Sequence, residues 1–202
     1  MWLDIFIVVI CLLSSLIIPV IITYKIKSIR FNPENETLSF LSNKRLFGKK
    51  MSEGYTEVLF VTGILSFAFF WLLVEKLHFV DDQSIWKWMI ISIGSLILLA
   101  FAHHNIIPYK WKYLYENFIR TLHNILAVVV FIALPVLIVK FDIFLFNERF
   151  AASLTGMGVI GITIIATIFT LIKKKKLTGI TEITFITGIC LWNIITTIFV
   201  IF

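Results

Sequence analysis

Long apolar runs separated by short polar segments dominate the sequence. Six runs reach or approach the roughly 17–25 residues that a membrane-spanning helix needs. They cover residues 2–23, 56–74, 86–102, 121–139, 151–172 and 179–202. Because backbone amides in hydrocarbon must be satisfied within their own segment, we expect helices rather than open strands. The pattern predicts an all-α polytopic membrane protein, a bundle of six transmembrane helices that forms one domain over residues 1–202.

Three local patterns refine this prediction. The first run lacks a basic leader and a cleavage site of small residues, so we expect it to stay in the protein as a span rather than act as a signal peptide. The longest loop, residues 24–55, is polar, and its LSFL segment could form a short interfacial helix. Pro135 lies inside the fourth run, and we expect it to kink that helix or end it early.

Composition supports the membrane interpretation. The 202 residues are 59% hydrophobic and 15% charged, whereas about a quarter of the residues of a soluble domain are charged. The formal net charge is +6, but no nucleic-acid-binding motif accompanies it, so we expect no nucleic acid partner. The two cysteines lie in apolar runs without CxxC spacing, which argues against a disulfide framework or zinc site. We predict no cofactor.

The basic residues predict an orientation. Fourteen of the eighteen Lys and Arg residues fall in loops one, three and five. Because cytoplasmic loops carry an excess of Lys and Arg, we expect these loops to be cytoplasmic and both termini to be outside. The run Lys173, Lys174, Lys175 and Lys176 belongs to loop five. We interpret it as an orientation signal that contacts anionic lipid headgroups.

Polar residues near the span ends are candidates for a functional cluster on the predicted cytoplasmic face. They are His103, His104, Glu116, Arg120, His123, Asn124 and Glu182. Spans three and four are expected to be antiparallel neighbours because their connection is short. His103, His104 and His123 are weak candidates for a metal or acid–base site, since imidazole suits both roles. The interpretation that we favour is interfacial histidines, with Arg120 meeting lipid phosphate.

Glu182, at the start of the last span, has two interpretations. An ionisable residue at a span edge is a functional candidate, and it could pair with Arg120 or Lys176. The simpler alternative is a carboxylate that reaches the interface. Asn124 and Asn193 lie within spans, where an amide needs a partner, and we expect both to form hydrogen bonds between helices.

The fifth span carries several small residues. They are Ser153, Gly156, Gly158 and Gly161. Small residues let helix backbones approach closely, so this face is suited to helix packing, to a protein partner or to a homo-oligomer.

Several motifs resemble a known family. The first loop contains NETLSFLS, the third contains NIIP, and LHNILAVVVFIALPVLI includes the pair His123-Asn124. The last span opens with GITE and carries Trp192. This pattern resembles the bacterial and archaeal six-span domain-of-unknown-function family nine-nine-eight, which implies a prokaryotic plasma membrane location. That family distantly resembles the eukaryotic group with the autophagy modulator DRAM and the GPI-anchor remodelling factor, which implies membrane-lipid handling.

Three functions fit these patterns. Our leading expectation is a non-enzymatic membrane protein that binds lipid or a partner protein, for example as an accessory subunit of a membrane complex, because Walker and GxSxG motifs are absent. The first alternative is a lipid-modifying or metal-dependent enzyme that uses a histidine cluster at the cytoplasmic face. The second alternative is a small transporter.

Overall fold

The computed structural model describes residues 1–27, 29, 31–102 and 111–202. Within these residues, six helices are long and apolar enough to cross a membrane, and there is no strand. The predicted all-α class is therefore confirmed, and the chain is an integral membrane protein. The first span joins α1 (Trp2–Leu12), a π-helical turn η1 (Leu13–Ile17) and α2 (Ile18–Lys27). The other spans are α4 (Lys49–Lys76), α5 (Gln83–Phe101), α6 (Leu114–Glu148), α7 (Phe150–Lys174) and α8 (Gly179–Ile201).

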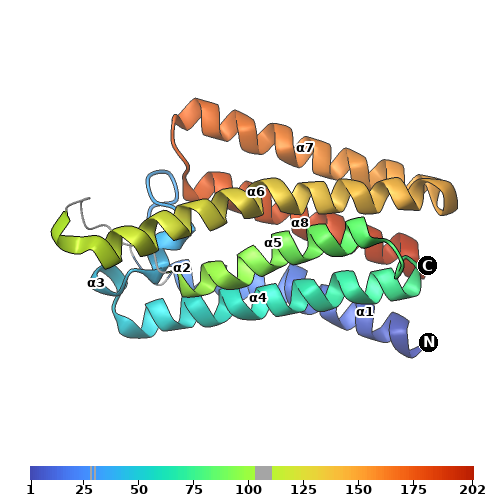
Figure 1. Cartoon of the computed structure of the whole chain (residues 1–202), viewed down its shortest axis with the longest axis horizontal. Helices are drawn as coiled ribbons and strands as arrows, with labels where there is room; N and C mark the ends of the chain where they lie inside the picture. The colour runs from blue at the N-terminus through green and yellow to red at the C-terminus, as the bar shows by residue number, and fades with distance from the viewer. Residues whose placement is uncertain (28, 30, 103–110) are drawn as a thin grey trace.

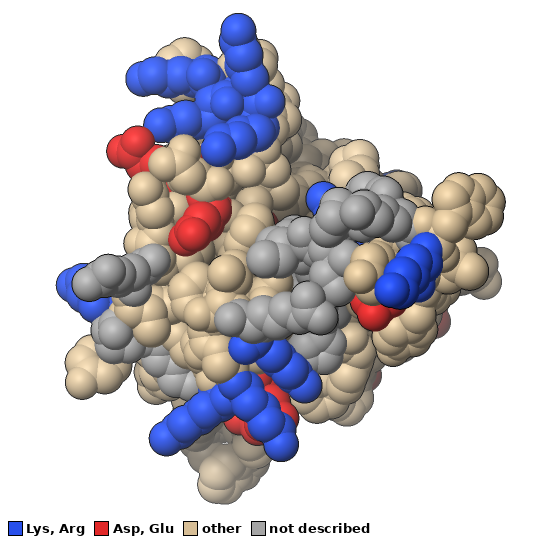
Figure 2. Space-filling model, turned by 90° about the vertical axis from the view of Figure 1, so that its left-hand side faces the viewer, with Lys and Arg blue, Asp and Glu red and all other residues tan. Residues whose placement is uncertain are grey.

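The helices form a closed bundle. Each long helix packs on the next one along the chain, and the first span packs on both α4 and α8. Figure 1 shows both termini at one end of the bundle. The first loop, the end of α5, the start of α6 and the turn from α7 to α8 lie at the other end. We call these the terminal end and the loop end. Figure 2 views the loop end, where Lys and Arg side chains gather at several places. The bundle thus separates the two sets of loops that the charge count distinguishes.

The fourth span is much longer than its apolar run. Helix α6 contains 35 residues and continues through Pro135 to Glu148. The prediction that Pro135 ends this helix early is therefore wrong. A proline removes one backbone hydrogen bond from a helix, and α6 also packs against α5 and α7, which hold the helix together. A single residue, Arg149, joins α6 to α7, and its guanidinium donates a hydrogen bond to the Phe199 carbonyl of α8.

The tightest packing lies toward the terminal end. Phe70 of α4, Phe141 of α6 and Trp192 of α8 are almost completely buried. The Trp192 ring stacks on Phe70 with centroids 5.5 Å apart and meets Phe141 edge-on at 5.8 Å. Such aromatic pairs add about 0.5–1.5 kcal/mol each to the burial of their surface. These three rings therefore join α4, α6 and α8.

The first loop packs against the start of α8 at the loop end. Its LSFLS segment forms a 3₁₀ helix, η2 (Leu38–Ser42), followed by the single turn α3 (Lys44–Phe47). Leu38 and Leu41 of η2 are buried. The first backbone N–H groups of α8 donate to this loop, Gly179 to the Glu36 carbonyl at 2.6 Å and Ile180 to the Pro33 carbonyl at 3.0 Å. These bonds satisfy the unpaired N–H groups that any helix start presents.

Candidate functional site

A cavity of about 750 Å³ lies between α6, α7, α8 and the first loop. We call it the lateral cavity. Its length along α6, from His123 to Pro135, is roughly 18 Å at about 1.5 Å per residue. Because a bilayer's hydrocarbon core is about 30 Å thick, this length is close to the depth of one leaflet.

The walls of the lateral cavity are almost entirely apolar. They are formed by Ala127, Val128, Phe131, Ile132, Pro135, Val136, Ile164, Ile168, Leu171, Leu177 and Phe185. Val128 and Ile132 of α6 and Ile168 of α7 are also exposed on the outside of the bundle. The cavity therefore opens sideways, toward the region that lipid chains occupy in a membrane.

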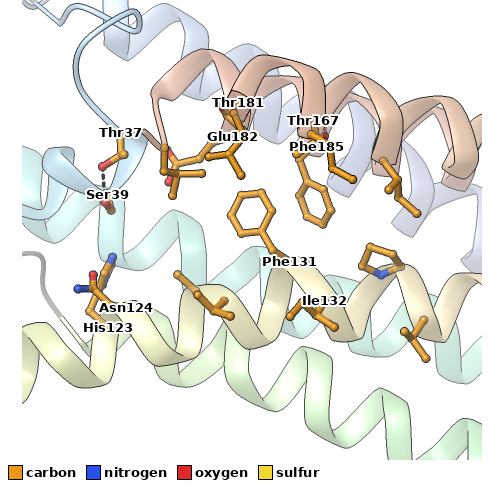
Figure 3. Close-up of a pocket in the computed structure, with 18 residues that line it drawn as sticks. Thr37, Ser39, His123, Asn124, Phe131, Ile132, Thr167, Thr181, Glu182 and Phe185 are labelled. Carbon is orange, nitrogen blue, oxygen red and sulfur yellow. Dashed lines mark hydrogen bonds between the residues drawn. The ribbon is translucent and has the colours of Figure 1, made fainter. Parts of the chain in front are cut away.

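Polar side chains gather at one end of the lateral cavity, next to the loop end of the bundle. Thr37 and Ser39 come from the first loop, His123 and Asn124 from α6, and Glu182 from α8. Figure 3 shows these groups on one side of the cavity, with Phe131, Ile132 and Phe185 beyond them. We call them the polar end. The arrangement matches an amphiphile, with hydrogen-bonding groups at one end and apolar walls along the rest.

Hydrogen bonds to the backbone fix two members of the polar end. Buried His123 contacts the Ala102 carbonyl through Nδ1 at 2.5 Å. Since a carbonyl oxygen only accepts, this Nδ1 carries a proton. Glu182 accepts a hydrogen bond from the backbone N–H of Leu38. The first loop thereby helps to hold the Glu182 carboxylate at the cavity.

A second, smaller cavity of about 150 Å³ lies inside the bundle. We call it the central cavity. Phe131, Glu182 and Phe185 line both cavities, and the two aromatic rings lie with centroids 4.5 Å apart. Asn193 lines the central cavity and donates to the Ser15 hydroxyl of η1 at 3.0 Å. The predicted interhelical hydrogen bond of Asn193 is therefore present.

The structure brings together only part of the predicted polar cluster. His123, Asn124 and Glu182 line one cavity. Arg120 and Glu116 lie one and two turns earlier on α6, outside the lining residues. His103 and His104 lie outside the described residues. Among the described residues, no three His, Cys, Asp or Glu side chains group as metal ligands, and the functional role of the cluster stays a prediction.

The lysine run has two kinds of environment. Lys174 forms an ion pair with Glu34 at 3.3 Å, and Lys176 contacts the backbone and side-chain oxygens of Asn35 at 3.4 Å. Lys173 and Lys175 are exposed. Lys176 and Glu182 thus both have partners in the first loop. Contact of this run with lipid headgroups stays a prediction.

The small residues of α7 do not share one face. Ser153 and Gly156 are buried within the bundle, whereas Gly158 is exposed. A Cβ atom on Gly156 would lie 2.5 Å from an Asp142 carboxylate oxygen, but one on Gly158 or Gly161 would meet nothing within 4 Å. Part of the predicted face therefore packs against α6. The remainder, Gly158 and Gly161, is still open to a partner.

Sequence analysis missed a fully buried carboxylate, Asp142 of α6. Both of its oxygens lie 3.1 Å from the Trp192 indole nitrogen, which donates to them. Asp142 follows the fourth apolar run, residues 121–139, so the hydropathy pattern places it in the next loop. The apolar residues that continue from Phe141 to Phe146 are the sequence signal that could have shown the helix continuing.

Comparisons with known proteins give one match. The family described as Protein of unknown function (DUF998) matches residues 9–198, which is nearly the whole chain. The search of curated proteins found no match. The search of solved structures found none either.

Proposed function

Starting from the fact that the chain belongs to the DUF998 family, whose description names no activity, we propose that it binds a membrane lipid in the lateral cavity. The observation that carries this proposal is the shape and polarity of that cavity. It has mostly apolar walls, an opening toward the lipid region and most of its polar groups at one end. A lipid would place its headgroup at the polar end and its chain along α6 and α7.

The dimensions suit a lipid acyl chain. The cavity runs roughly 18 Å along α6, which is close to the depth of one leaflet. A chain entering from that leaflet would lie along the apolar wall, with its polar group at the polar end.

Two further features support lipid binding. The resemblance to the DRAM and GPI-anchor remodelling proteins points to membrane-lipid handling. The lysine run and the other basic side chains at the loop end suit contact with an anionic membrane surface, which attracts Lys and Arg by about 1 kcal/mol per residue. Together with the predicted orientation, they support a lipid bound from the cytoplasmic leaflet of a prokaryotic plasma membrane.

Filling the cavity tests the proposal. We expect Ile132→Trp, at the cavity wall, to reduce the lipid that remains bound after purification, measured by native mass spectrometry. Ile143→Trp is the matched control, because Ile143 is on the same helix and is 55% exposed, against 59% for Ile132, but lies outside the cavity. Equal lipid retention by both variants would contradict lipid binding in this cavity.

A second candidate function is a lipid-modifying enzyme. The observation in its favour is that His123 and Glu182 line the same end of the cavity, where an imidazole and a carboxylate could transfer protons to and from a bound lipid. Mass spectrometry of vesicle lipids incubated with the protein tests this candidate. Lipid turnover that is lost in both His123→Ala and Glu182→Gln would support it, and an unchanged lipid composition would exclude it for the lipids used.

A further inference from the structure

The charges around the lateral cavity indicate which headgroup it accepts. Building on the proposed function, we propose that its ligand is an uncharged lipid with a free hydroxyl group, of the diacylglycerol class, rather than an anionic phospholipid. Two observations support this proposal. They are the chemical groups at the polar end and the contacts of the nearby lysines with the first loop.

Among the described residues, the polar end offers acceptors and hydroxyl groups but no Lys or Arg. Among the described residues that line the cavity, none is Lys or Arg, and Glu182 is the one carboxylate. A phosphate in such a site would lie beside a carboxylate, in a low-dielectric region where like charges repel strongly. A buried phosphate needs a paired cation, which is usually Arg or Lys. The lining therefore disfavours an anionic headgroup.

The lysines next to the cavity point toward the first loop. Lys174 pairs with Glu34, and Lys176 contacts Asn35. Neither Glu34 nor Asn35 lines the cavity. Lys174 and Lys176 therefore contact the first loop, and neither side chain lines the cavity.

A hydroxyl headgroup finds partners in the same place. One oxygen of Glu182 accepts from the Leu38 N–H, which leaves the other able to accept from a lipid hydroxyl. Thr37 and Ser39, whose hydroxyl groups are 2.7 Å apart, and Asn124 can donate to it.

A matched pair of lipids tests the inference. Dioleoylglycerol and dioleoylphosphatidic acid have the same chains and differ only by the phosphate. Each is titrated into the delipidated full-length protein, and binding is measured by native mass spectrometry. We expect dioleoylglycerol to bind at least about tenfold more tightly, because like-charge contacts are strongly unfavourable. Equal or tighter binding of phosphatidic acid would overturn the inference.

Two variants sharpen the test. Glu182→Gln removes the negative charge but keeps an acceptor for the Leu38 N–H. We expect this variant to reduce the difference in affinity between dioleoylglycerol and dioleoylphosphatidic acid. Because this change could disturb the first loop, Asn124→Lys adds a cation at an exposed lining position. It should increase phosphatidic acid binding several-fold, whereas Thr121→Lys, exposed one turn earlier and outside the lining, should not. If both Glu182→Gln and Asn124→Lys keep the wild-type ratio of affinities for the two lipids, charge at the polar end does not select the headgroup.

Ile132→Trp separates this inference from the proposed function. If Ile132→Trp weakens binding of both lipids and phosphatidic acid is preferred, the cavity binds lipid but the headgroup assignment is wrong. If Ile132→Trp weakens binding of neither lipid, the lateral cavity is not the binding site and both proposals fail.

Discussion

At the scale of single residues, Asp142 and Trp192 form a hydrogen-bonded pair that is buried inside the bundle. The carboxylate is completely buried, and the indole N–H donates to it from a different helix. A buried polar group is expensive when it loses its hydrogen-bond partner. The pair therefore links α6 to α8, and this link needs both the carboxylate acceptor and the indole donor.

We expect Trp192→Phe to lower the stability of the protein in detergent by about 1–3 kcal/mol, because it leaves the Asp142 carboxylate without its donor. Thermal unfolding followed by circular dichroism measures the loss. The double variant Trp192→Phe with Asp142→Leu removes both polar groups, and it should be more stable than Trp192→Phe alone. A double variant that is less stable than Trp192→Phe would show that the carboxylate has another essential partner.

At the scale of helices, α6 and α7 approach closely where Gly156 faces Asp142. A Cβ atom at Gly156 would lie within 2.5–2.9 Å of the carboxylate group. We expect Gly156→Ala to destabilise the protein by about 1–3 kcal/mol, the usual cost of overpacking. Gly158→Ala, on the same helix with open space around it, should be neutral or slightly stabilising. Similar melting temperatures for the two variants would contradict this packing.

The contact of the first loop with α8 depends on another glycine. A Cβ atom at Gly179 would lie 2.8 Å from the Glu36 carbonyl oxygen and 3.1 Å from the Pro33 Cα atom, both in the backbone. We expect Gly179→Ala to push the loop away from α8. The Leu38 amide should then exchange its hydrogen faster, as measured by hydrogen–deuterium exchange. Gly94→Ala in α5, where a Cβ atom would meet nothing within 4 Å, should leave this exchange rate unchanged.

At the scale of the whole molecule, the charge count predicts that the loop end faces the cytoplasm. We expect Asp81→Cys at the terminal end to react with a membrane-impermeant maleimide added to intact cells. Lys173→Cys at the loop end should react only after the cells are opened. Both positions are exposed, and both variants are made in a background without Cys11 and Cys190. Labelling of Lys173→Cys in intact cells would reverse the orientation.

The sequence predicts the number of spanning helices, but it does not predict where a helix ends near charged residues. Apolar length alone predicts six spans, because membrane helices need little else. Lys140 and Asp142 interrupt the fourth apolar run, so the end of α6 was placed too early. The helix continues because Trp192, fifty residues later, provides a partner for Asp142. Such a distant contact is invisible to a hydropathy pattern.

The site was predictable only in part, for a similar reason. His123, Asn124 and Glu182 stood out as polar residues at span ends, and they line the same cavity. Thr37 and Ser39 did not stand out, because nothing in the sequence shows that the first loop folds back onto α8. The cavity could not be predicted either. It depends on the distance between α6 and α7 near the loop end, and the sequence of neither helix alone determines that distance.

The pairing of Asp142 with Trp192 also constrains how the protein is made. A ribosome synthesises α6 before α8, so Asp142 emerges long before the indole that will bind it. An unpaired carboxylate costs about 2.5–3.5 kcal/mol at the centre of a spanning helix on insertion scales and less toward its ends, where Asp142 lies. The single-residue turn at Arg149 brings α7 beside α6 as soon as both have emerged, but α7 does not provide the indole donor. We therefore expect the insertion machinery to hold α6 and α7 as a hairpin and to release them into lipid only when α8 arrives.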